Sequence, residues 1–321
     1  MSRMKRVVVA IAGAIAVLPA VARGVPIVAG SSQARVRAVR ATAQRAASCR
    51  ALGDFYWEIG DADGALASGQ IGRRYGAQTE IAVASASKLV FGAYVLEKIG
   101  RAPSPAEVEA LTLRSGYDSF RPLPCALATT VQGCFARGSN SAFTPQDVGH
   151  FYYGGGHDEK LAIDLGLGPL DRDGLAREVR RVLGNDLAFS YATPDLAGGL
   201  RSSPATYGRF LRKILRGELR IASYLASPAV CTLPGSCPGA LHSPAPVAWH
   251  YGLNHWIEDD PDGDGAFSSA GAFGFYPWIT ADQALYGLLA RHAYQRDAGI
   301  ASAGCGQLLR RAWATGRPQL D

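Results

Sequence analysis

The order of the predicted helices and strands constrains the fold of this chain more than any other feature. An Ala- and Arg-rich stretch without Pro or Gly predicts a helix over residues 31–50. Two strands are predicted at 54–59 and 64–71, on either side of a turn rich in Gly and Asp. A closing helix is predicted at 299–314. The strand pattern returns only shortly before that helix, in three segments at residues 247–257, 266–275 and 283–290.

The long middle of the chain is predicted to be mostly helical, with its clearest helices at 175–183 and 203–215. Connections of hairpin length link the late strands, so the sheet should be antiparallel and should take its strands from both chain ends. This pattern predicts an α+β fold. Residues 23–103 and 200–321 would form a sheet lobe flanked by helices, and residues 104–199 an inserted helical lobe of the same domain.

The first 22 residues have the pattern of a secretory signal peptide. Three positive charges at positions 3, 5 and 6 precede an apolar run over 7–18, and Ala20-Val21-Ala22 offers the small residues that signal peptidase accepts. The alternative is an uncleaved anchor, but the run is shorter than the roughly 20 residues that a spanning helix needs. We therefore expect an exported protein, periplasmic or extracellular, without stable membrane insertion after cleavage.

The charge balance gives no support for nucleic acid as a partner. The chain has 33 basic and 27 acidic residues, and three basic but no acidic residues fall within the first 22. The mature chain would carry 30 − 27, a net charge of about +3, which is too small to indicate a polyanionic partner.

Six cysteines in an exported chain predict disulfides, because that compartment is oxidising. Two pairs are close in sequence and flanked by Pro or Gly, as in loops closed by a local bridge. The other two lie just before the strand at 54–59 and soon after the strand at 283–290, and they meet if these strands pair antiparallel. No cysteine or histidine spacing indicates a metal site. The expected bridges are Cys49–Cys305, Cys125–Cys134 and Cys231–Cys237.

The motif that carries chemistry is Ser85-Ala86-Ser87-Lys88, at the start of a helix predicted over 85–99. Ser85 and Lys88 lie one turn apart on the same face, and residues 89–96 are all apolar, aromatic or Gly, so the helix should be buried. The chain has five Lys against 28 Arg. Arginine cannot release its proton in a protein, whereas a desolvated lysine can act as a base. The alternative is that Ser85 caps the helix and Lys88 extends to water.

This segment resembles a known family. Ser-x-x-Lys is a signature of the serine β-lactamase and penicillin-binding-protein superfamily, and residues 81–90 resemble its nucleophile segment. Residues 111–117 and 197–203 are similar to the Leu-x-x-x-Ser-Gly and Gly-Gly-Leu-x-Ser stretches of the class C β-lactamase and esterase branch. The resemblance spans about residues 54–292 and implies the α+β fold with the inserted helical lobe.

The resemblance implies that Ser85 is the acylated nucleophile and that Lys88 is its base. In the second signature, Tyr-x-Asn, Tyr153 matches the catalytic tyrosine and Gly155 stands where Asn is usual. The phenol would pass a proton between the lysine and the leaving group. A tyrosine that only packs beside the Gly-rich loop is the structural alternative. The rival candidates for the catalytic role are Tyr152 and Tyr191.

The third signature, Lys-Thr-Gly or His-Thr-Gly, is matched by Ser269-Ala270-Gly271. The backbone N–H of Ala272 would then complete an oxyanion hole with that of Ser85, since a backbone donor does not depend on the side chain. The cation that helps to bind a substrate carboxylate in the family is missing, as is the Asn of the second signature. These departures favour a neutral ester or amide over a β-lactam, with Arg201 as a candidate replacement for the cation.

The sequence therefore predicts a serine hydrolase that forms an acyl-enzyme with an ester, amide or peptide substrate and needs no cofactor. The alternative from another class is a catalytically inactive relative that binds a cell-wall peptide or a protein partner. The segment Asp260-x-Asp262-x-Asp264-Gly265 matches half of a calcium loop, but Gly271 stands where a bidentate Glu is required, so an acidic hairpin loop is expected. His157 and His255 are expected to be polar residues with satisfied hydrogen bonds.

Overall fold

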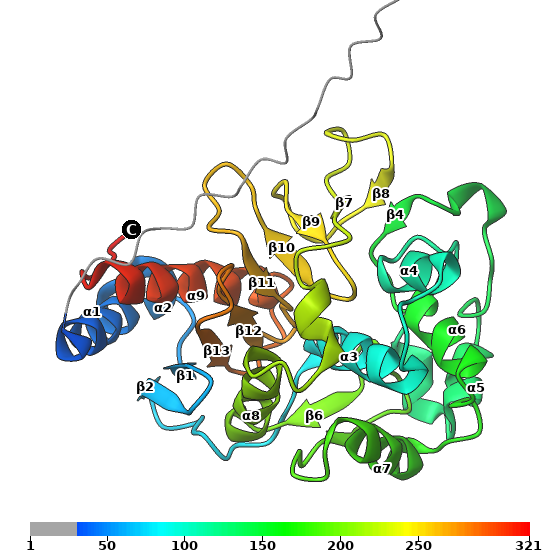
Figure 1. Cartoon of the computed structure of the whole chain (residues 1–321), viewed down its shortest axis with the longest axis horizontal. Coiled ribbons are helices and arrows are strands. Elements are labelled where there is room, and N and C mark those ends of the chain that lie inside the picture. The colour runs from blue at the N-terminus through cyan, green and yellow to red at the C-terminus, as the bar shows by residue number, and fades with distance from the viewer. Residues whose placement is uncertain (1–30) are drawn as a thin grey trace, which may run out of the picture.

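A single antiparallel sheet dominates the computed structural model, which describes residues 31–321 (Figure 1). The strands run in the order β2-β1-β13-β12-β11-β10-β9-β7. The first two come from early in the chain and the others from residue 230 onward, which confirms the predicted α+β fold with strands from both chain ends. The strands are β1 (Phe55–Gly60), β2 (Ala65–Ile71), β7 (Val230–Cys231), β9 (His250–Tyr251), β10 (Trp256–Glu258), β11 (Ala266–Ser268), β12 (Tyr276–Ile279) and β13 (Tyr286–Ala290).

The register of β1 against β13 brings the two chain ends together. Tyr56 pairs with Ala290 and Gly60 with Tyr286, so the start of β1 lies beside the end of β13. Cys49, in α2 (Ala47–Arg50), is consequently bridged to Cys305 in α9 (Ala298–Thr315). The local bridges Cys125–Cys134 and Cys231–Cys237 are also present, so all three predicted pairings are confirmed.

The late strands differ from the prediction. The segment 247–257 is not one strand but two, β9 and β10, which pair antiparallel around a turn in which Asn254 has φ 63°. The segment predicted as a strand over 266–275 ends at Ser268, and β12 begins only at Tyr276. Periodicity alone did not resolve these reversals, because apolar residues such as Leu253 and Phe273 lie within both turns, beside Gly and polar residues.

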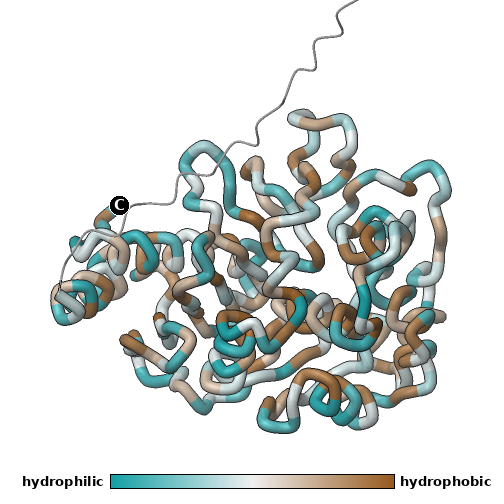
Figure 2. The backbone as a smooth tube through the Cα atoms, viewed as in Figure 1, coloured by the Kyte–Doolittle hydropathy of each residue, from teal (hydrophilic) through white to brown (hydrophobic). Residues whose placement is uncertain are grey.

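The sheet separates two apolar layers, as the alternation of a pleated strand requires. Phe55, Trp57 and Ile59 face one core with α1 (Ser32–Arg45) and α9, whereas Tyr56 faces the other core. Figure 2 shows apolar residues gathered along the helix α3 (Ser87–Ile99) at the centre of the molecule. The predicted helix over residues 31–50 is present as α1 and α2, with a break at Ala46.

The middle of the chain is mostly helical and lies beside α3 in Figure 1. Two small sheets tie it to the rest: β3 (Ile81–Ala82), β6 (Leu200–Ser202) and β5 (Ser190–Tyr191) form one, and β4 (Phe151–Tyr152) with β8 (Ala240–His242) the other. The remaining helices are α4 (Pro105–Leu111), α5 (Val131–Phe135), α6 (Gly156–Asp164), α7 (Arg172–Leu183) and α8 (Pro204–Leu215). Short 3₁₀ turns are η1 (Ala84–Ala86), η2 (Leu123–Leu127), η3 (Pro145–Asp147) and η4 (Arg220–Tyr224).

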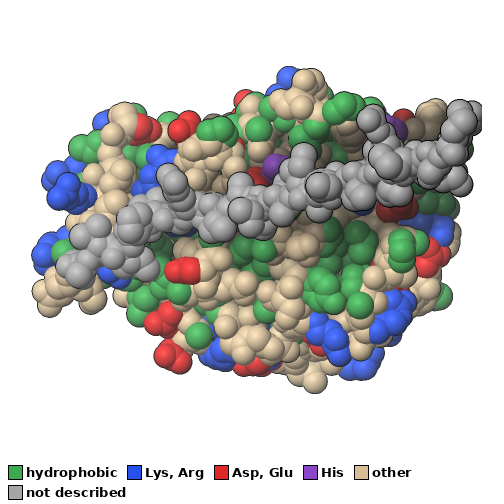
Figure 3. Space-filling model, turned by 45° about the horizontal axis from the view of Figure 1, so that its top comes forward, with side chains coloured by type: hydrophobic (Ala, Val, Ile, Leu, Met, Phe, Trp, Pro, Cys, Tyr) green, Lys and Arg blue, Asp and Glu red, His purple; other side chains and the backbone are tan. Residues whose placement is uncertain are grey.

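The signal peptide predicted for residues 1–22 lies outside the described residues. Among residues 31–321, no helix has both the length and the apolar character needed to span a bilayer. Figure 3 shows one face of the molecule, on which the Lys and Arg side chains form several separate groups with Asp and Glu among them.

Candidate active site

Ser85 lies at a strained turn between β3 and α3. The residue before it, Ala84, has φ 47°, in the left-handed region that residues with a Cβ rarely occupy. Such strain persists where the surrounding structure enforces it, which is common at functional sites. Ser85 is half-buried and does not cap α3, whose N-cap residue is Ala86 and has no side-chain cap. The capping alternative for Ser85 is therefore wrong.

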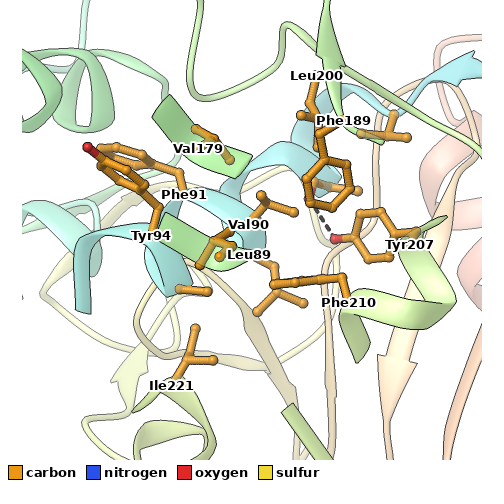
Figure 4. Packing of buried hydrophobic residues seen from close by; sticks show 14 of the residues in the cluster. Leu89, Val90, Phe91, Tyr94, Val179, Phe189, Leu200, Tyr207, Phe210 and Ile221 are labelled. Carbon is orange, nitrogen blue, oxygen red and sulfur yellow. Dashed lines mark hydrogen bonds between the residues drawn. The ribbon is translucent and has the colours of Figure 1, made fainter. Parts of the chain in front are cut away.

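Hydrogen bonds to two other elements, one from a backbone N–H and one from a side chain, hold this turn in place. The hydroxyl of Ser87 donates to the carbonyl of Ala84 at 2.5 Å and accepts from the N–H of Leu200 at 3.2 Å. The hydroxyl of Tyr207, in α8, donates to the carbonyl of Ala86 at 2.7 Å. Figure 4 shows this bond beside the apolar side chains that pack around α3. The turn is thus fixed from β6 and from α8.

Lys88 is 3% exposed, so it does not extend to water as the structural alternative supposed. Its Nζ donates to the carbonyl of Ala197 at 3.0 Å and lies 3.9 Å from Oδ2 of Asp158. The ring of Tyr153 is also close, with its centroid 5.2 Å from Nζ. The segment 197–203, singled out by resemblance, supplies the carbonyl that holds the amine.

The three candidate tyrosines lie in different places. Tyr153 lines the same cavity as Ser85 and stacks on Trp256, with ring centroids 5.2 Å apart. Tyr152 lies against His242 instead, at 5.0 Å between centroids. Tyr191 is buried, and burial raises the pKa of its hydroxyl further above the ordinary value. The geometry brings only Tyr153 of these three into contact with both the cavity and Lys88.

The segment matched to the third signature, residues 269–271, packs against the turn that holds Ser85. Ser269 donates its hydroxyl to the carbonyl of Ser85 at 3.2 Å. A Cβ on Gly271 would lie 2.0 Å from the carbonyl oxygen of Val83, so the close approach of the two segments requires glycine. Ala272 lines the cavity, and within residues 31–321 its N–H donates no backbone hydrogen bond.

The cavity has a volume of about 400 Å³ and is bounded mainly by aromatic and aliphatic side chains. Two charged residues on the segment before α9, Arg296 and Asp297, also line it, and Arg296 has no ion pair within the described part of the chain. The sequence analysis did not single out either of them. The lining residues are Ser85, Tyr153, His242, Pro244, Ala245, Trp249, Trp256, Ala270, Ala272, Arg296, Asp297, Gly299 and Ile300.

The position of the missing asparagine has no room for one. A Cβ on Gly155 would lie 2.7 Å from the ring of Phe120 and 2.9 Å from Cβ of Ala197. Arg201, the predicted substitute for the missing cation, is instead paired with Glu80 at 2.8 Å and does not line the cavity. That suggestion is not supported by the structure.

Three buried carboxyl groups beneath Lys88 were missed by the sequence analysis. Burial raises the pKa of Asp158 to about 7, although Lys88 and Asn254 oppose the shift. Burial and the nearby Asp195 carboxylate raise the pKa of Glu159 well above its usual range. Glu159 accepts the N–H groups of Leu196 and Ala197, and so helps to fix the loop that holds Lys88. Asp158 and Glu159 lie in the first turn of α6, where acidic residues are common, so the pattern did not single them out.

The acidic segment 260–265 and the two histidines weighed in the sequence analysis make structural contacts. Asp264 is paired with Arg310 of α9, and Asp260 accepts the indole N–H of Trp249 at 2.7 Å. Within residues 31–321 no group of three or more potential ligands is placed to hold a metal. The imidazole rings of His157 and His255 are buried, and each has hydrogen-bond partners, as expected.

Comparisons with known proteins support the fold. No family model matches the sequence, and no curated protein matches it either. Among solved structures, a candidate β-lactamase from Bacteroides dorei aligns with a TM-score of 0.61 and 19% identity, covering 81% of this chain and 93% of that one. EstCE1, a hydrolase with promiscuous acyltransferase activity, aligns at 0.62 and 13%, covering 88% and 99%.

A penicillin-binding protein homologue from Pyrococcus abyssi, described as octameric, aligns with a TM-score of 0.58 and 13% identity, covering 87% of this chain and 77% of that one. At these identities the alignments establish the fold alone, and the resemblance first noted at Ser85 and Lys88 extends over most of the described chain. The chain therefore has the fold shared by serine β-lactamases, penicillin-binding proteins and related hydrolases.

Proposed function

We propose that this protein is an exported serine hydrolase that forms an acyl-enzyme at Ser85. The observation that carries the proposal is the meeting of Ser85, Tyr153 and Ala272 at one cavity, with the buried amine of Lys88 beneath the tyrosine ring. A nucleophile, a base and a backbone donor converge there, which is the minimum for acyl transfer. Three disulfides in the chain are compatible with an oxidising compartment and support export.

In the proposed mechanism, neutral Lys88 accepts the proton of the Ser85 hydroxyl while Oγ attacks the carbonyl carbon. The N–H groups of Ser85 and Ala272 hold the oxyanion of the tetrahedral intermediate. Tyr153 passes the proton from the lysine to the leaving group as the bond to that group breaks. Water then attacks the acyl-enzyme by the same path in reverse, and Ser85 regains its proton.

A neutral ester is the substrate class that the site favours. Ser269 replaces the cation of the third signature and is already bonded to the carbonyl of Ser85. Gly155 leaves no side chain to hold an acyl-side amide, and Phe120 fills the space. The rings of Tyr153, Trp249 and Trp256 offer apolar surface to an acyl group instead.

Intact-mass analysis after treatment with a fluorophosphonate tests the proposal. We expect a single adduct on the wild-type protein and none on Ser85→Ala. The matched control is Ser269→Ala, which removes the other serine of the site and should still be labelled. Absence of any adduct on the wild type across pH 5–9 would favour the alternative, an inactive relative that binds a peptide or a protein partner.

A further inference from the structure

Asp158 is a fully buried carboxyl group next to the proposed base. It belongs to α6, its side chain is 0% exposed, and its Oδ2 lies 3.9 Å from Nζ of Lys88. The other oxygen, Oδ1, accepts the side-chain N–H of Asn254 at 2.8 Å. Oδ2 accepts no hydrogen bond from the described residues, so the oxygen that faces the lysine is available to it.

The surroundings of Asp158 contain little else that could pair with it. Asn254 has φ 63° in the turn between β9 and β10, a conformation that Asn tolerates better than most residues with a side chain. That turn aims the amide of Asn254 at the carboxyl group. The titratable groups that interact with Asp158 are Lys88 of α3, Asp195 of the segment after β5, Tyr251 of β9 and Glu159 of its own helix.

We propose that Asp158 is a positioning residue for Lys88, an inference that rests on the proposed function. A neutral amine has two N–H bonds and one lone pair. The carbonyl of Ala197 takes one N–H at 3.0 Å, and ionised Asp158 takes the other. With both N–H bonds directed at these acceptors, the lone pair is left for the hydroxyl of Ser85.

The separation of 3.9 Å is about 1 Å longer than a hydrogen bond. Bonds of this kind are often long in a free enzyme and tighten in the complex with substrate. Over one acylation step the pair gains no net proton. Asp158 stays ionised while Lys88 accepts the proton from Ser85 and returns it through Tyr153 to the leaving group.

The pH dependence of acylation follows from the charge that Asp158 needs. The protonated carboxyl group offers its own O–H to the amine and blocks the lone pair. Because burial raises the pKa of Asp158 to about 7, the ionised form is present above that pH and lost below it. Acylation should therefore rise with pH up to about 7 and then level off.

The variant Asp158→Asn keeps the shape of the side chain and removes the charge. Asn254 would hold the amide oxygen, so the amide N–H₂ would face the amine of Lys88, donor against donor. We expect the second-order rate of labelling by a fluorophosphonate at pH 8 to fall about tenfold to a hundredfold, because a misplaced base costs rates of that order. The break near pH 7 should disappear from the profile.

Two further variants keep the inference testable if Asp158→Asn folds poorly. Asn254→Gly tolerates the positive φ and removes the donor to the carboxylate, so the pKa of Asp158 should rise and the break should move to higher pH. Asp164→Asn, an exposed acid at the end of the same helix, is the matched control and should leave the profile unchanged. Thermal unfolding of each variant reports whether it folds.

Two outcomes would overturn the inference. One is an unchanged break near pH 7 in Asp158→Asn with wild-type stability. The other is faster labelling of that variant below pH 7, which would mean that the carboxylate only holds Lys88 as a cation. Failure of the wild type to form any adduct would instead contradict the proposed function itself, so the two failures are distinguishable.

Discussion

The two walls of the cavity differ in what they retain of the family pattern. The helix wall is Tyr153, which lines the cavity, backed by the buried side chains of Lys88 in α3 and Asp158 in α6, so the proposed proton-transfer groups lie on this side. The strand wall, Ser269 to Ala272, has lost its cation and presents small side chains and a backbone N–H. Proton chemistry depends on particular side chains, whereas an oxyanion donor needs only backbone. Under the proposed function, we therefore expect this protein to differ from β-lactamases in its substrate more than in its reaction.

Substitution of Tyr153 tests the helix wall and should give the largest effect. Tyr153→Phe keeps the stack on Trp256 but removes the proton-transfer group, so ester turnover should fall by about two to four decades. Steady-state kinetics with p-nitrophenyl acetate measure this. Tyr191→Phe is the matched control, since its hydroxyl lies outside the cavity, and should retain near-normal rates. The reverse result, a collapse only in Tyr191→Phe, would mean that the second signature is wrongly aligned.

Removal of a backbone donor tests the strand wall. Ala272→Pro deletes the N–H proposed for the oxyanion hole, and turnover should fall by about two to three decades, mostly in kcat. Ala272→Ser keeps the N–H and should remain within about threefold of wild type. Equal losses in the two variants would point to a steric effect of the side chain, and the strand wall would then have no part in stabilising charge.

Much of the frame could be predicted from the sequence because it depends on local patterns. Strand signals near both chain ends, with hairpin-length connections between the late strands, predicted the antiparallel pairing of β1 with β13, and that pairing placed Cys49 beside Cys305. Ser85 and Lys88 are three residues apart, in the turn η1 and the first turn of α3, so no long-range information was needed to place them together. The Lys88–Ser85 side of the site was predictable for the same reason.

The contacts that the sequence did not predict are long-range. Asp158 is 70 residues from Lys88, and an acid in a first helical turn looks like an ordinary helix-dipole partner until its burial is known. The turn at Asn254 was missed although Gly252 and Asn254 are common turn residues, because the aromatic and apolar residues on either side fit the pattern of one strand. Arg296 precedes a helix in a polar stretch, and only the fold brings it to the cavity.

Arg296 offers the finest test of the comparison, because it is an exposed cation at the cavity beside a strand wall that has lost its own. An exposed charge pair is worth about 1 kcal/mol or less, which corresponds to a factor of about five. We expect Arg296→Ala to lower kcat/KM for the hemisuccinate ester of p-nitrophenol by no more than that factor, and to leave the acetate ester unaffected. Nitrocefin turnover should stay orders of magnitude below that of the acetate ester in both proteins.

The control for Arg296 is Arg201→Ala, because Arg201 is also exposed but is paired with Glu80 away from the cavity. This variant should not separate the two esters. High salt should abolish the small preference of the wild type for the charged ester, since exposed pairs are screened. A loss of a hundredfold in Arg296→Ala with the charged ester would show that Arg296 replaces the lost cation. Efficient nitrocefin turnover by the wild type would contradict the expected preference for a neutral ester. In either case the strand side of the cavity would bind a carboxylate. The contrast between the two walls would then concern only where the cation stands in the sequence.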